Sequence, residues 1–148
     1  MNTAILYCSR HHGNTKKLLD AIAQRHPVTL IDAAAAPCPD LSVYDRIGLA
    51  SGIYYSGFDP SIRKAVESIP AGKHVFFLYT CGSLKGDPTR ALAKLVETRG
   101  SQVAGRYGCL GYDTFGPFRL IGGLAKGHPT PEEVEQAVRF YESLPPVD

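Results

Sequence analysis

The sequence predicts an α/β fold built on a doubly wound parallel sheet, and two observations lead to this class. Five short apolar runs of strand length alternate with segments of helical spacing, which is the order of repeated strand–helix–strand units. The first run is continuous and apolar, as expected for a strand that helices cover on both faces. The length of 148 residues predicts a single domain over residues 1–148.

The first half of the chain supplies three strands and two helices. TAILYC (3–8) is a short apolar run that ends in polar residues, and residues 14–25 then place four apolar side chains on one helical face. VTLIDA (28–33) and IGLASG (47–52) are the second and third strands. SIRKAVESI (61–69) returns to helical spacing and is closed by a Pro-Ala-Gly sequence.

The second half adds two strands and two helices. HVFFLYT (74–80) is a strongly apolar strand, and Asp87–Pro88 is predicted to open a helix that stops at Gly100. SQVAGRYGCLG (101–111) is a fifth strand, weakened by its glycines. TPEE (130–133) predicts the start of the last helix, because its threonine and second glutamate can form a capping box.

Composition and charge exclude several classes of partner. The net charge is +2 and no basic block is longer than Lys16–Lys17, so we expect no nucleic-acid surface. We expect neither a signal peptide nor a membrane span, since a strand begins almost at once and no apolar run is long enough. Four widely spaced cysteines without a CxxC pair are typical of reduced thiols in a cytoplasmic protein: Cys8, Cys38, Cys81 and Cys109.

The chemically unusual loops are predicted to share one edge of the sheet. Right-handed crossovers place every strand-to-helix loop at the carboxyl ends of the strands, where open α/β sheets bind ligands. The loops concerned are residues 9–15, 53–59, 81–87 and 111–118. We therefore expect them to form one site.

The first loop, SRHHGNT, allows three interpretations. A metal site is disfavoured because His11 and His12 are adjacent and no third ligand stands at a recognised spacing. Cys8 before such a loop is similar to the nucleophile of the low-molecular-weight tyrosine phosphatases. Those enzymes place an essential arginine six residues later, where this chain has Asn14. Without that guanidinium nothing stabilises the thiolate or the transferring phosphoryl group, so the phosphatase interpretation is rejected.

The third interpretation is a cradle for a phosphate that is held and not attacked. Gly13 permits a tight turn, and the short polar side chains of Ser9, Asn14 and Thr15 surround a helix N-terminus with free N–H groups. The alternative is that Asn14 or Thr15 simply caps the helix.

GNT after the first strand, with SGIYYSG and TCGS after later strands, resembles the flavodoxin family over essentially the whole chain. The resemblance implies a three-layer α/β/α sandwich, a five-stranded parallel sheet in the order 2-1-3-4-5, and one non-covalent FMN. The first loop is one residue longer than the usual form, and His12 replaces the threonine expected before the glycine.

The implied flavin site draws on all four loops. Tyr54 or Tyr55 would stack on the flavin, and the Ser56–Gly57 peptide would lie near it, either as a redox-linked flexible peptide or as a plain turn. The third loop has no aromatic residue. The implied FMN-binding residues are Ser9, Arg10, His11, His12, Gly13, Asn14, Thr15, Ile53, Tyr54, Tyr55, Ser56, Gly57, Thr80, Cys81, Gly82, Ser83, Tyr112 and Asp113.

Three functions stay open. The favoured one is electron transfer with a redox partner protein that the sequence does not identify. The second is an NAD(P)H-dependent FMN or quinone reductase, in which the nicotinamide docks on the flavin because no GxGxxG fingerprint is present. The third is a non-catalytic module with a vestigial flavin site. No catalytic residue and no metal are predicted.

Overall fold

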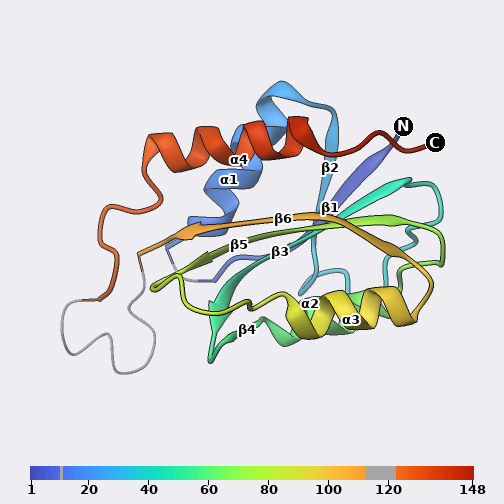
Figure 1. The fold of residues 1–148 in the computed structure, drawn as a ribbon, viewed down its shortest axis with the longest axis horizontal. Helices are drawn as coiled ribbons and strands as arrows, with labels where there is room; N and C mark the ends of the chain where they lie inside the picture. Colours follow the sequence, from blue (N-terminus) through green and yellow to red (C-terminus); the bar gives the residue numbers. More distant parts are fainter. Residues whose placement is uncertain (11, 113–122) are drawn as a thin grey trace.

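The computed structural model describes residues 1–10, 12–112 and 123–148, and it has the expected three-layer α/β/α architecture (Figure 1). None of the helices in these ranges has the length and apolar character that crossing a membrane requires. The elements in chain order are β1 (Thr3–Cys8), α1 (Asn14–Arg25), β2 (Val28–Asp32), β3 (Arg46–Tyr54), β4 (Gly57–Phe58), α2 (Pro60–Val66), β5 (His74–Cys81), α3 (Arg90–Thr98), β6 (Gln102–Leu110) and α4 (Pro131–Ser143).

Five parallel strands form the sheet in the order β2-β1-β3-β5-β6. This confirms the expected order 2-1-3-4-5, because β5 and β6 are the fourth and fifth parallel strands once the antiparallel strand β4 is left out. Helices α1 and α4 pack together on one face, and α2 and α3 on the other (Figure 1). The parallel strands therefore all end at the same edge of the sheet, from which their described connections to the helices begin.

The core consists of two layers, one on each face of the sheet. Consecutive strand residues point to opposite faces, so Phe76 packs with the α1 and α4 layer and Phe77 with the α2 and α3 layer, and neither is exposed. Ile5 and Leu6 divide in the same way. Because helices cover both faces of the sheet, consecutive residues of a strand are all apolar and do not alternate between apolar and polar.

A short hairpin extends β3 beyond its expected end. The strand continues to Tyr54 and turns back through Tyr55 and Ser56 into β4, where Gly57 pairs with Tyr54. The two turn residues have positive φ angles of 49° and 66°, the pattern of a two-residue hairpin turn whose twist matches its strands. The sequence concealed this turn because neither residue is glycine or asparagine.

The two predicted helix starts have different outcomes. Helix α3 begins at Arg90 and not at Asp87, whose Oδ1 instead accepts hydrogen bonds from the N–H and hydroxyl of Thr89 at 2.9 and 2.6 Å. Such local bonds compete with the helical conformation. The capping box of α4 is confirmed: Thr130 Oγ1 accepts from Glu133 N–H (3.2 Å), and Thr130 N–H donates to Glu133 Oε1 (2.8 Å).

Candidate functional site

A pocket of about 290 Å³, partly open to solvent, lies at the carboxyl edge of the sheet. It is formed by the carboxyl ends of β3 and β5 together with residues that follow β1, β5 and β6, so described residues from each of the four expected loops meet here. Its lining residues are Ser9, Asn14, Thr15, Gly52, Ile53, Tyr54, Thr80, Cys81, Gly82, Gly111 and Tyr112.

The N-terminus of α1 forms one end of this pocket. Gly13 precedes the helix with a φ of 63°, and an added Cβ would meet nothing within 4 Å, so its backbone conformation is what requires glycine. The first turn contains no acidic residue, and Ser9 Oγ accepts a hydrogen bond from Lys16 N–H at 3.3 Å. The helix start therefore presents a positive field suited to an anion.

Asn14 does not cap the helix. Its side chain is 6% exposed, and its Nδ2 donates to the backbone carbonyl of Tyr112 at 2.7 Å. Its Oδ1 is buried and, within the described residues, has no hydrogen-bond partner. A buried acceptor without a donor is costly, so this oxygen indicates a ligand that supplies one.

Thr15 does not cap the helix either, because its hydroxyl lies 2.9 Å from the hydroxyl of Thr80 on β5, and both side chains are buried. Two hydroxyl groups carry two protons, and their mutual hydrogen bond uses one of them. The pair therefore has one O–H left to donate to a ligand in the pocket.

Two tyrosines line the pocket. Tyr54 comes from the end of β3, and Tyr112 follows β6. The ring of Tyr112 stacks on His12, with ring centroids 4.4 Å apart and an interplanar angle of 24°. The aromatic residue that the third loop lacks is thus supplied by the fourth loop.

The turn of the β3–β4 hairpin does not line the pocket. Tyr55 is 86% exposed, and the positive φ angles belong to Tyr55 and Ser56 and not to Gly57, which lies in β4. Seven of the residues implied by the resemblance do not line the pocket: Arg10, His12, Gly13, Tyr55, Ser56, Gly57 and Ser83. His11 and Asp113 lie outside the described residues.

Two glycines belong to the pocket that the sequence did not single out. A Cβ at Gly52 would lie 2.8 Å from the Tyr54 hydroxyl oxygen, and a Cβ at Gly111 would lie 2.9 Å from Asn14 Nδ2. Each glycine therefore makes room for a pocket side chain. The sequence could have identified both, because a glycine at the carboxyl end of a strand often marks a close approach of another group to the backbone.

Arg10 forms an ion pair beside the pocket. Its Nε donates to Asp59 Oδ2 at 2.7 Å, and the other carboxylate oxygen of Asp59 accepts from Ser61 N–H at 2.9 Å, which caps α2. Burial alone would raise the pKa of Asp59, but the hydrogen bonds from Ser61 and Arg10 hold it below its ordinary value. The guanidinium is thereby committed to a structural partner.

The surroundings of Cys8 bear on the phosphatase interpretation. Cys8 is 3% exposed, and burial raises the pKa of its thiol despite hydrogen bonds with Ser61 and Arg10. A protonated thiol is a poor nucleophile, which supports rejecting the phosphatase. Within the described residues, no group of three or more His, Cys, Asp or Glu side chains is arranged to hold a metal ion.

Comparisons with known proteins agree with this architecture. The family model of the flavodoxin domain matches residues 4–118. An uncharacterized protein of Methanocaldococcus jannaschii is 33% identical over 147 residues, covering 97% of this chain and 98% of the relative. Oxidised flavodoxin 2 from Bacillus cereus has a TM-score of 0.66 and 23% identity, covering 95% of this chain and 94% of that chain.

A larger protein contains a similar unit. The rubredoxin oxygen:oxidoreductase of Desulfovibrio gigas has a TM-score of 0.71 and 17% identity, covering 97% of this chain and 35% of that chain. This likeness is one of fold. With the family model and the relative taken together, the chain belongs to the flavodoxin family.

Proposed function

We propose that this protein binds one non-covalent FMN in the pocket and acts in electron transfer. The observation that carries the proposal is the pocket itself. A helix N-terminus and a buried Asn14 oxygen, which has no hydrogen-bond partner in the described part of the chain, share one space there with Tyr54 and Tyr112. FMN consists of a phosphate, a chain of hydroxyl groups and an aromatic ring. The helix N-terminus suits the phosphate, the Asn14 acceptor suits a hydroxyl group, and the two tyrosines suit the ring.

The residues divide among those parts by their chemistry. Ser9, the hydroxyl pair of Thr15 and Thr80, and the first N–H groups of α1 would hold the phosphate. Asn14 Oδ1 is an acceptor and therefore suits a ribityl hydroxyl better than a phosphate oxygen. The two tyrosines would flank the ring, since aromatic groups stack favourably.

Bound FMN would supply reversible redox chemistry with one or two electrons. The residues of this chain would bind it, orient it and keep its ring near the surface for a redox partner protein, which is part of the proposal. The same proposal includes a cytoplasmic location, which is supported by four widely spaced cysteines that contain no CxxC pair.

A reductase that takes hydride from NAD(P)H is the second candidate. The observation that favours it is the third loop, where Thr80, Cys81 and Gly82 line the pocket with small side chains. Such a wall leaves room for a second ring against the flavin. Stopped-flow mixing of the FMN-loaded protein with NADH or NADPH separates the candidates, because rapid direct flavin reduction would favour the reductase.

Titration of the protein with FMN tests the proposal. Quenching of FMN fluorescence should reach saturation at one equivalent. The double variant Asn14→Ala with Thr15→Ala should weaken binding at least about tenfold, since each residue removes a polar contact worth about 1 kcal/mol. The control Thr98→Ala removes an exposed hydroxyl that bonds Lys94 O in α3 and should leave binding unchanged.

Two results would contradict the proposal. Equal FMN affinity in the double variant and the parent would show that FMN binds elsewhere. A parent that binds no flavin would leave the non-catalytic module as the remaining function.

A further inference from the structure

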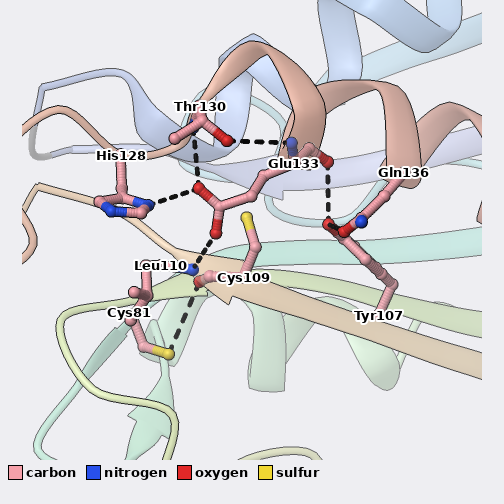
Figure 2. Close-up of polar contacts among 8 residues, drawn as sticks. All are labelled: Cys81, Tyr107, Cys109, Leu110, His128, Thr130, Glu133 and Gln136. Atoms are coloured by element: carbon pink, nitrogen blue, oxygen red, sulfur yellow. Dashed lines mark hydrogen bonds and ion pairs between the residues drawn. The ribbon is translucent and has the colours of Figure 1, made fainter.

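Glu133, in the first turn of α4, makes more contacts than helix capping needs. Its Oε1 accepts from Thr130 N–H and from His128 Nδ1, while its Oε2 accepts from the backbone N–H of Leu110, the last residue of β6, at 3.3 Å (Figure 2). The hydroxyl of Tyr107 on β6 also donates to the Glu133 carbonyl, at 2.8 Å. A capping box uses only the first of these contacts.

The chain segment that Glu133 holds is part of the pocket wall. After Leu110, Gly111 N–H donates to the carbonyl of Cys81 and Tyr112 N–H donates to the carbonyl of His128, both at 2.9 Å. Gly111 and Tyr112 line the pocket. The backbone N–H of each residue from 110 to 112 is thus bonded to another part of the chain. Glu133 makes the bond to Leu110 directly, and it holds His128, which makes the bond to Tyr112.

We propose that Glu133 is a positioning residue for the FMN pocket, a role that rests on the proposed function. One carboxylate oxygen fixes the end of β6 through Leu110, and the other fixes the His128 ring, whose own carbonyl holds the backbone of Tyr112. Glu133 itself does not line the pocket. It acts by placing the aromatic wall that Tyr112 supplies.

The carboxylate is ionised for this role. Partial burial would raise the pKa of Glu133, but hydrogen bonds from the Thr130 backbone and from His128, with the charge of His128 and the bond from Leu110, hold it below its ordinary value. An anion accepts three donors at once. A neutral glutamine of the same size cannot, because its Nε2 is a donor and would face an N–H group.

Three variants of the full chain, titrated with FMN, test the role. Glu133→Gln should bind FMN at least about tenfold more weakly than the parent, the loss expected for one hydrogen bond to a charged acceptor. Thr130→Ala removes the helix cap but leaves the Leu110 contact, so it should lower the melting temperature with FMN affinity unchanged. Glu132→Gln removes an exposed charge from the same helical turn and should change neither quantity.

Backbone amide NMR of the flavin-free protein gives a second readout that does not require FMN. The Leu110 and Tyr112 amide signals should shift in Glu133→Gln and stay in place in Thr130→Ala. FMN affinity that falls equally in these two variants would overturn the proposal, since capping alone would then explain the loss. Unshifted Leu110 and Tyr112 amide signals in Glu133→Gln would overturn the positioning role, whether or not the parent binds FMN. A parent that binds no FMN, with the amide signals shifted as expected, would overturn the proposed function instead.

Discussion

Replacing Gly111 with alanine tests how the pocket is packed. The new Cβ would lie 2.9 Å from Asn14 Nδ2, closer than real Cβ atoms come to a neighbour, and 3.0 Å from Asn14 Cβ and Cγ, which is also unusually close. Because Asn14 is 6% exposed and Nδ2 is bonded to the Tyr112 carbonyl at 2.7 Å, it cannot move without breaking that bond. The φ of Gly111 is not among the positive values, so the effect is purely steric.

The expected cost is about 2 kcal/mol of unfolding free energy, from one lost hydrogen bond and a buried amide left without a partner. For a chain of this size that lowers the melting temperature by about 4–8 °C. FMN affinity should fall about tenfold, because Asn14 and Tyr112 both line the pocket.

Gly57→Ala is the matched control for this prediction. A Cβ at Gly57 would meet only the Tyr54 carbonyl oxygen at 4.0 Å, so an alanine there should leave the stability of the apoprotein within about 0.5 kcal/mol of the parent. Thermal unfolding of the apoproteins and fluorescence titration with FMN measure both effects. A Gly111→Ala protein with the parent's stability and affinity would refute the packing argument.

Two further predictions concern titratable groups. Since the folded-state pKa of Asp59 is lowered, its contribution is full above the unfolded pKa of about 4 and is lost as the pH falls through the folded value. Asp59→Asn should therefore cost about 1–2 kcal/mol in urea unfolding at pH 7, and a cost that does not shrink in acid would contradict this assignment. Among the cysteines, exposed Cys38 should react first with a thiol reagent, whereas burial raises the pKa of Cys109 to about 12 and should keep it unreactive until the protein unfolds. Fast labelling of Cys109 in the native protein, measured by peptide mass spectrometry, would show that the strand end opens.

The sequence by itself determined the elements and the edge at which the site lies. Apolar runs and helical spacing are local patterns, so each of the five parallel strands and four helices in the described part of the chain was found from its own residues, whereas the short strand β4 was not. The parallel topology then placed the loops together without any side-chain detail. The hairpin turn at Tyr55 and Ser56 escaped notice because its positive φ angles fall on residues that rarely adopt them.

Only the tertiary structure decided which side chains meet in the pocket. Asn14 and Tyr112 are 98 residues apart and are joined by one hydrogen bond, and Glu133 reaches Leu110 across 23 residues. Tyr54 lines the pocket while its neighbour Tyr55 is exposed, although the two are the same residue type in sequence. Contacts between distant segments depend on how the layers pack. The local spacing of apolar residues predicts a helix or a strand, but it does not tell which side chains of distant segments will meet.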